Sequence, residues 1–468
     1  MLQSRILQYA LLSIFALLVF AAFAFPVQRG AAFDAAPTGQ VSAAEMTPEE
    51  RGQWNLQHKP YGSALPLNKK LLENLAKVWE PEWKAKIDPN DPDSIRKVAF
   101  ERYGFSEATW DNKGAPLQFV ATEAGMWTQN CMLCHGGRVP ISGESKIGMP
   151  NTELDMQTLY DDATNLTKMK GPIQLTFGMS RGRTNAFIFS LELLRRRNED
   201  MSPRKEPLPM GDYTDYDLDA PPWWYLKKKT ALYADAGVKG DFTRAIMQFT
   251  MGEPSGEKIR SWETDFKDIL AYLKSIEAPK YPLPINQKLA AEGQQVFNKT
   301  CSVCHGAYGA DGKYPNTVVP LDVVGTDALR LTKLTKEFRD YYKQSWFGKA
   351  GEHGYEYPTG YVAPPLIGVW ASAPYFHNGS VPTLYGVLTA EARPKYFRRI
   401  GGAKEYDAVN LGLKVEKLNA PAPKDAPGEA RRRVVDTTLP GLSNQGHPFG
   451  FKLNEKEKRQ VIEYLKTL

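Results

Sequence analysis

Two short motifs hold the residues best suited to chemistry in this sequence. Both read C-x-x-C-H, and they occupy Cys131–His135 and Cys301–His305. The chain has four cysteines in 468 residues, so the two motifs use all of them. Two cysteines three positions apart can each add to a vinyl group of one haem, and the adjacent histidine then reaches the iron. The motifs therefore predict two covalently bound haem c groups.

Each motif residue has an expected role. The covalent attachment points are Cys131 and Cys134 for haem 1, and Cys301 and Cys304 for haem 2. The proximal iron ligands are His135 for haem 1 and His305 for haem 2. The alternative is a zinc site, in which the two cysteine pairs supply four thiolates. Haem is favoured because a zinc site would need neither the histidine after each pair nor the export signal described below.

The second axial ligand of each iron decides between electron transfer and chemistry, because an open iron position binds peroxide or dioxygen. All twelve methionines lie at or before Met251, so haem 2 has none in its own half. Its remaining candidates are His353, His377 and His447, or no ligand. For haem 1 the candidates are more numerous, because His58 lies upstream and its half of the chain contains many methionines. Eight of these methionines are considered as ligands. These are Met149, Met156, Met169, Met179, Met201, Met210, Met247 and Met251.

The N-terminal segment and the charge balance of the chain indicate where the protein is located and which partners it has. Residues 1–27 carry Arg5, then a mostly apolar stretch with an Ala-Phe-Ala sequence at 22–24, which predicts a signal peptide or a membrane anchor. We therefore expect a periplasmic or extracytoplasmic protein, with the inner membrane as the anchoring site if the segment is retained. Basic and acidic residues are nearly balanced, at 59 and 53, which argues against a nucleic-acid partner.

The chain divides by composition into four parts. Residues 28–66 are expected to form a tether, 67–280 a first haem domain and 285–468 a second, joined by a Pro-rich linker. Apolar spacing predicts helices over about 69–78, 94–103, 242–251, 261–276, 287–299 and 455–468. The closing helices share a Tyr-Leu-Lys sequence, at 272–274 and 464–466, which favours an internal duplication. The expected fold is mainly α, with two class I cytochrome c-like domains and long loop insertions.

A glycine marks the expected helix crossing in the second half. Gly293 and Phe297 lie one turn apart before Cys301, and we expect the glycine to let its helix cross the last helix at Tyr464. By position relative to the motif, the first half has Trp127 in place of Phe297 and Glu123 in place of Gly293. At this position the first half therefore lacks the glycine that a close helix crossing needs.

Three further segments carry a family resemblance. Residues 364–370 and Ala373–Leu384 (Ala-Pro-Tyr-Phe-His-Asn-Gly-Ser-Val-Pro-Thr-Leu) resemble the signature of the bacterial di-haem cytochrome c peroxidases. Asp436–His447 is similar to the rubber oxygenase branch of that superfamily, as is Pro221–Trp224 with the lysines at 227–229.

The resemblance implies roles for four more residues. His447 would be the distal ligand of haem 2, and His377 would support a haem pocket without binding iron. Trp223 and Trp224 would relay electrons between the haems; ordinary core packing is the alternative. Peroxidases of the superfamily also hold a calcium ion between domains, although no clear ligand set for calcium is present in this sequence.

Two functions follow as expectations. The first is an oxidoreductase with peroxide or dioxygen chemistry at haem 1 and electron storage at haem 2. The second is a di-haem electron carrier in which both irons have two protein ligands. In either case the expected partner is a small redox protein or a quinol-linked electron donor or acceptor, and the substrate stays open because function resides in the site rather than the fold.

Overall fold

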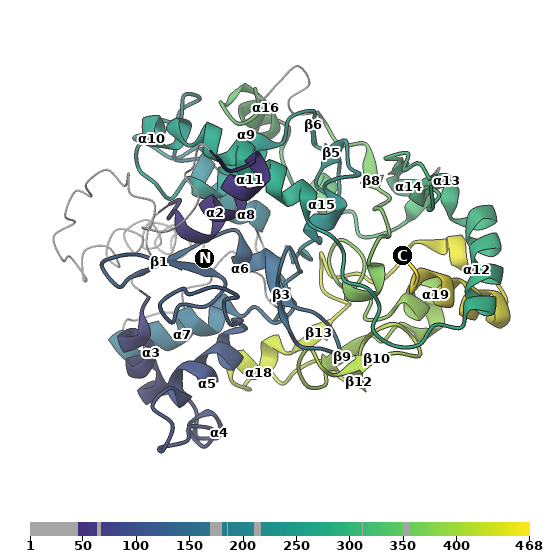
Figure 1. Ribbon diagram of the computed structural model, residues 1–468, viewed down its shortest axis with the longest axis horizontal. Coiled ribbons are helices and arrows are strands. Elements are labelled where there is room, and N and C mark those ends of the chain that lie inside the picture. Colours follow the sequence, from purple (N-terminus) through teal and green to yellow (C-terminus); the bar gives the residue numbers. More distant parts are fainter. Residues whose placement is uncertain are drawn as a thin grey trace.

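The computed structural model describes residues 45–62, 67–168, 180–184, 186–209, 217–310, 312–349 and 356–468. The expected signal or anchor at 1–27, His353, Met169, Met179 and Met210 lie outside these residues. In Figure 1 most of the first half of the chain lies on the left and most of the second half on the right, while α16 (Lys336–Gln344) and α18 (Gly428–Arg432) of the second half reach over to the left. None of the helices in the described part combines the length and the apolar character that crossing a membrane requires.

In the described part of the first half, five helices are nine or more residues long and the others are shorter. They are α2 (Pro48–His58), α3 (Lys69–Leu75), η1 (Ala76–Val78), α4 (Pro81–Lys84), α5 (Ser94–Tyr103), α6 (Met132–His135), α7 (Met156–Thr167), α8 (Ala186–Leu194), η2 (Trp223–Tyr225), α9 (Thr243–Met247), η3 (Gln248–Thr250), α10 (Gly256–Ser261) and α11 (Glu263–Ser275).

The second half begins and ends with its longest helices. Its helices are α12 (Gln287–Thr300), α13 (Ser302–His305), α14 (Leu321–Val324), α15 (Leu329–Thr332), α16 (Lys336–Gln344), η4 (Val369–Ala371), α17 (Leu384–Leu388), η5 (Ala390–Ala392), α18 (Gly428–Arg432), η6 (Pro448–Gly450) and α19 (Glu455–Leu465).

The described strands are two to four residues long and pair antiparallel. Five pairs are β1 (Phe119–Ala121) with β2 (Trp127–Gln129), β3 (Gly136–Arg138) with β4 (Ser145–Ile147), β5 (Ala231–Leu232) with β6 (Val238–Lys239), β7 (Val318–Pro320) with β8 (Gly360–Val362), and β10 (Tyr406–Asp407) with β11 (Gly412–Leu413). A three-stranded sheet places β9 (Tyr396–Arg399) between β12 (Val415–Leu418) and β13 (Val434–Asp436).

The expected fold class is wrong. About 39% of the described residues are helical and about 12% lie in strands, so the architecture is an α/β mix with small sheets, and two class I cytochrome c domains are not shown. The strands were missed because two to four residues are too few to display a period of two. The main hydrophobic core also includes residues of both halves, from Leu56 to Leu465, whereas independent domains would each have their own core.

Each half is nevertheless closed by one pair of crossing helices, α2 with α11 and α12 with α19, which lie side by side in Figure 1. A Cβ atom added at Gly293 would lie 1.9 Å from the carbonyl oxygen of Gln460, on α19. A Cβ atom at Gly52 would lie 2.0 Å from the carbonyl oxygen of Asp268, on α11. Asp268 and Gln460 immediately precede the similar sequences that contain Tyr-Leu-Lys in α11 and α19. The two helix crossings are therefore equivalent.

The crossing corrects two expectations from the sequence. The counterpart of Gly293 is Gly52, on a helix 79 residues before Cys131, and Glu123 has no such role. Part of the expected tether at 28–66 is also folded, because it contains α2. Asp268 accepts from Arg51 at 2.8 Å and Asp265 accepts from Lys59 at 3.0 Å, which fixes α2 on α11.

The region between α2 and the first motif packs with α7 around a second core. Leu72, Trp79, Phe100, Phe105 and Phe119 are among its fully buried side chains. The second half has no such insertion, because α12 runs directly into Cys301. The duplicated arrangement is therefore unequal, and the first half carries an added layer beside its C-x-x-C-H motif.

Candidate functional site

The first motif forms a single helical turn, α6, with Cys131 as its N-cap. Residues three apart on a helix lie on one face, so the two thiols point to the same side. Nδ1 of His135 lies 3.0 Å from the carbonyl oxygen of Pro221. Because a carbonyl can only accept, Nδ1 carries the proton and Nε2 is left with a lone pair. The ring also stacks on Trp223 at 4.9 Å between centroids.

The second motif is built in the same way. Cys301 leads into α13, and Nδ1 of His305 lies 2.8 Å from the carbonyl oxygen of Pro364. The hydroxyl of Tyr308 donates to the carbonyl of His305 at 2.9 Å and fixes the end of the turn. Metal-ligating histidines are commonly held by a bond from the other ring nitrogen to a carbonyl. Both motif histidines therefore have the arrangement of an iron ligand.

The two prolines were not identified from the sequence, although a signal for them exists. Pro221 and Pro364 each stand in an Ala-Pro-Pro sequence, at 220–222 and 363–365, so the same tripeptide serves both halves. Both segments had been noted for other reasons. The equivalence became visible only when both carbonyls were seen to accept from the motif histidines.

Burial keeps both histidines in the neutral form that binds metals. Burial lowers the pKa of His135 to about 4, opposed by the bond to Pro221, and lowers the pKa of His305 for the same reason. Burial raises the pKa of Cys131 and Cys301 to about 11 each, so these thiols are protonated before reaction. Among the described residues, no three His, Cys, Asp or Glu side chains gather as a metal-binding group. The four thiols therefore do not converge on a zinc site.

The structure brings His447 opposite His305. Their ring centroids are 6.1 Å apart. Two bonds of about 2 Å from a metal to ring nitrogens, plus roughly 1 Å from each nitrogen to its ring centre, give about 6 Å. The two rings are therefore spaced to bind one iron from opposite sides. Burial lowers the pKa of His447 to about 3, so this ring is also neutral.

His377 has a different neighbour. Its ring stacks on Tyr361 at 4.4 Å between centroids, and its Nε2 lies 3.3 Å from the Tyr361 hydroxyl. Burial lowers its pKa to about 3. Among the described histidines it is thus His447, and not His377, that contacts the ring of His305.

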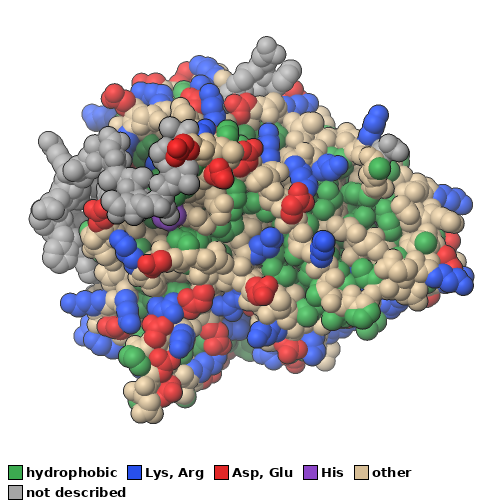
Figure 2. Space-filling model, viewed as in Figure 1, with side chains coloured by type: hydrophobic (Ala, Val, Ile, Leu, Met, Phe, Trp, Pro, Cys, Tyr) green, Lys and Arg blue, Asp and Glu red, His purple; other side chains and the backbone are tan. Residues whose placement is uncertain are grey.

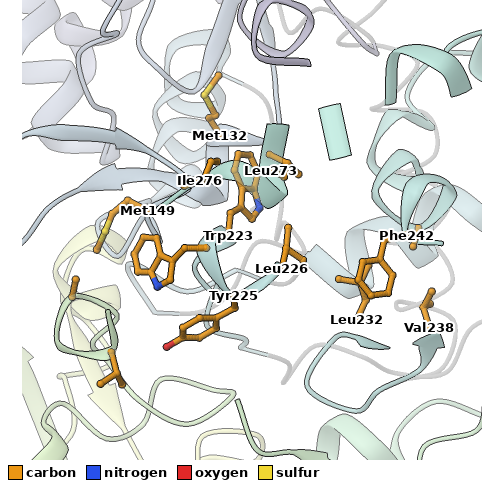
Figure 3. Close-up of a cluster of buried hydrophobic side chains, with 14 of the residues drawn as sticks. Met132, Met149, Trp223, Tyr225, Leu226, Leu232, Val238, Phe242, Leu273 and Ile276 are labelled. Atoms are coloured by element: carbon orange, nitrogen blue, oxygen red, sulfur yellow. The ribbon is translucent and has the colours of Figure 1, made fainter. Parts of the chain in front are cut away.

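The tryptophan pair lies between the two motifs. Trp223 contacts His135, and Figure 3 shows its ring beside Met132, Leu273 and Ile276. Trp224 is fully buried and donates from Nε1 to the carbonyl of Ile367 at 2.7 Å. Ile367 lies three residues after Pro364, which holds His305. The pair therefore connects the proximal side of one motif to that of the other.

The remaining candidates for haem 1 are occupied elsewhere or packed in the core. His58 is exposed at the end of α2, with Nδ1 3.0 Å from the carbonyl of Trp54 and its ring stacked on the same residue. Met149, Met201, Met247 and Met251 belong to the main core, and Met156 to the smaller one. In the described part of the chain, the ring in contact with His135 is Trp223, whereas His305 also faces a second histidine.

Comparison with known proteins supports a cytochrome. Residues 360–398 match a family model described as RoxA-like, cytochrome c-like. The segment contains His377 and both signature prolines at 364 and 365. The match supports a cytochrome c-like protein related to the rubber oxygenases, and such a domain implies covalently bound haem c and iron.

Two curated relatives come from Sinorhizobium fredii, and both are named as uncharacterized proteins. The protein y4iM is 27% identical over 293 residues, which is 53% of this chain and 64% of the relative. The protein y4iJ is 39% identical over 127 residues, which is 25% of this chain and 19% of the relative. The chain thus spans less than two thirds of either relative.

Proposed function

We propose that this protein is an exported di-haem c-type cytochrome that acts as an oxidoreductase. Haem 1 would be held by Cys131, Cys134 and His135, and haem 2 by Cys301, Cys304 and His305, with His447 as its second axial ligand. When bound, haem supplies an iron that exchanges electrons and, at a free axial position, reacts with peroxide or dioxygen. The observation that carries this proposal is the unequal pairing of the two motif histidines, of which His305 faces His447 and His135 faces none of the described histidines.

Residues around both motifs support different roles for the two haems. The carbonyls of Pro221 and Pro364 orient the two proximal rings, and the low pKa of each ring keeps its lone pair available. Trp223 and Trp224 offer a buried aromatic path from His135 toward the segment that holds His305. Because both indoles are shielded from water, electrons would move between the haems with little solvent rearrangement.

An apolar rim beside haem 2 supports exchange with a small redox protein or a quinol-linked partner. Val303 lies between the two cysteines of the second motif and is 76% exposed, and Val323 and Phe449 are also exposed. Figure 2 shows hydrophobic side chains gathered over the right-hand part of the molecule, which holds the second half of the chain. Residues 1–27 would direct the protein to the periplasm or tether it to the inner membrane. The calcium ion that the superfamily resemblance suggests stays a prediction.

The second candidate is an electron carrier in which haem 1 also has two protein ligands. The methionines of the first half favour it, because a thioether can serve as the second ligand of a haem c iron. Electron paramagnetic resonance of the oxidised protein separates the two functions. One high-spin and one low-spin signal support the enzyme, whereas two low-spin signals unchanged by peroxide or half-reduction support the carrier.

The haem count and the axial ligand have direct tests. A pyridine haemochrome assay should give two haems per chain, and one after Cys301→Ala/Cys304→Ala. His447→Ala should make haem 2 high-spin, and His377→Ala, as the matched control, should not. A change caused by His377→Ala alone would reassign the ligand.

A further inference from the structure

An arginine of the first half, Arg183, donates two hydrogen bonds to the loop that follows Pro374 in the second half. Arg183 is 4% exposed, and its Nε donates to the carbonyl of Asn378 at 2.8 Å. Its Nη2 donates to the carbonyl of Gly379. A Cβ atom at Gly379 would lie 2.6 Å from Nε of Arg183, so the guanidinium occupies space that only glycine leaves open. The backbone N–H of Asp219 adds a third bond, to the carbonyl of His377 at 2.9 Å.

The same loop holds the segment that leads to His447. The side chain of Asn378 is fully buried, and its Nδ2 donates to the carbonyls of Gly441 at 2.9 Å and Ser443 at 3.0 Å. The hydroxyl of Ser380 also donates to the Ser443 carbonyl, at 3.0 Å. Four residues after Ser443 comes His447, so the loop fixes the path of the chain just before this ring.

His447 needs such support because its backbone is unfavourable when left alone. Its φ of +53° lies in the left-handed region, which costs a residue with a Cβ atom free energy unless surrounding contacts impose it. Its N–H donates to the carbonyl of Val324 at 2.6 Å. Phe376, which belongs to the same loop, packs against His447 with 6.2 Å between the ring centroids. The loop thus contacts His447 both through the backbone of 441–443 and directly.

The hydrogen bonds that hold this loop begin beside the first haem-attachment motif. Asn151 donates from its N–H to the carbonyl of Cys134 at 2.8 Å, and Gly182, next to Arg183, donates to the carbonyl of Leu154 at 2.8 Å. Thr184 forms a backbone bridge with Leu218, with both N–H···O bonds at 2.8 Å, and this places Asp219 at the loop. One continuous set of hydrogen bonds therefore runs from the residues around Cys134 to the segment that carries His447.

We propose that Arg183 and Asn378 are positioning residues that hold His447 opposite His305, so that the first half of the chain sets the axial ligation of haem 2. Neither residue contacts the reacting atoms; both act through the loop at 377–380. This inference rests on the proposed function, because it concerns a ligand of haem 2. It predicts that loosening the loop releases His447 from the iron while the haem itself stays attached.

The test measures the spin state of haem 2 in the oxidised, haem-loaded protein. Arg183→Leu removes the fork, and Asn378→Asp keeps the shape of the side chain but removes both Nδ2 donors. Because hydrogen bonds to charged or fully buried groups are the strong ones, we expect each variant to raise the high-spin fraction of haem 2 at least about tenfold. Added imidazole should restore the low-spin signal by taking the place of His447. Arg183→Lys, which keeps the charge but cannot bridge two carbonyls as a planar fork, should have an intermediate effect.

Arg399→Leu is the matched control. Arg399 also joins the halves, through a bond from Nη1 to Thr152 Oγ1 at 2.8 Å, but it does not touch the loop or the segment at 441–447. Its low-spin signal should stay as in the parent protein. An equal loss of low-spin signal in Arg399→Leu, or a high-spin form that imidazole cannot restore, would mean general loosening and overturn the proposal.

The remaining outcomes separate this inference from the proposed function. If His447→Ala removes the low-spin signal and neither Arg183→Leu nor Asn378→Asp changes it, the ligand assignment stands and the positioning role is wrong. If His447→Ala leaves the signal unchanged, the assignment of His447 fails and the positioning role fails with it. Should Arg183→Leu not fold, Asn378→Asp decides alone, because it interrupts the same set of bonds one step closer to His447.

Discussion

Replacing the crossing glycines by alanine tests the equivalence of the two halves. A Cβ atom at Gly52 would lie 2.0 Å from a backbone oxygen of α11, and one at Gly293 would lie 1.9 Å from a backbone oxygen of α19. Real Cβ contacts do not fall below 3.0 Å, so the helices of each pair must separate by about 1 Å. A backbone carbonyl cannot turn aside as a flexible side chain can.

The expected magnitude follows from two opposing contributions. Overpacking of this kind costs about 1–3 kcal/mol, and the upper end applies because backbone must move. Alanine is a better helix former than glycine by about 1 kcal/mol, which offsets part of that cost. The net loss is about 2 kcal/mol at each crossing, equivalent to a roughly thirtyfold larger open population of the helix pair and correspondingly faster exchange.

Hydrogen exchange measured by mass spectrometry reports each crossing separately. Gly52→Ala should accelerate exchange in α2 and α11, and Gly293→Ala should accelerate it in α12 and α19. The exposed neighbours Gln53→Ala and Gln295→Ala are the controls and should leave exchange unchanged. If Gly52→Ala slowed exchange in α2, as a gain in helix propensity alone would, the close crossing in the first half would be refuted.

Three further predictions concern buried polar groups. Burial lowers the pKa of Lys229 to about 8. Between about pH 8 and the ordinary pKa of lysine, the unfolded state therefore binds more protons than the folded state, so the free energy of unfolding should rise with pH in this window. Urea titrations at several pH values should show this rise, and Lys229→Met should abolish it. Arg102→Leu should cost about 3–5 kcal/mol, because it leaves the carboxylate of Asp162 buried without its 2.7 Å partner. That variant should recover stability as the pH is lowered, since burial already raises the pKa of Asp162, and Asp162→Leu added to it should recover part of the loss at neutral pH. Trp224→Phe should cost about 1–3 kcal/mol in chemical denaturation, because the partly buried Ile367 carbonyl loses its donor; an unchanged midpoint would contradict the bond.

Helices with strong local signals were predicted well. The helix at 94–103 has the expected ends, and α19 begins with the expected capping box, in which Asn454 and Glu457 cap each other's backbone. The helix α2 was missed, although Thr47 and Glu50 form the same capping box before it. The composition of residues 28–66 favoured a tether, and the capping box was not given weight against it. The apolar contacts that stabilise α2 come from α11, more than two hundred residues away, so they are invisible in a local window.

Strands and glycine partners were beyond the sequence for a related reason. Each β-strand in the described part is only two to four residues long, and its stability comes from the partner strand. The counterpart of Gly293 was sought at a fixed distance from Cys131, but an insertion that packs around a second core separates the two in the first half. Spacing along the chain therefore gave Glu123, whereas contact across the helix pair identifies Gly52.

The sequence by itself determined the chemistry of attachment, because C-x-x-C-H places two thiols and an imidazole within one helical turn, and this needs no distant contact. It also limited the second ligand of haem 2 to three histidines or none, through the absence of methionine after Met251. Only the tertiary structure decided that His447 faces His305 while His377 stacks on Tyr361. That choice depends on how loops distant in sequence pack together and hydrogen-bond, and their closure is fixed by long-range contacts that no local pattern records.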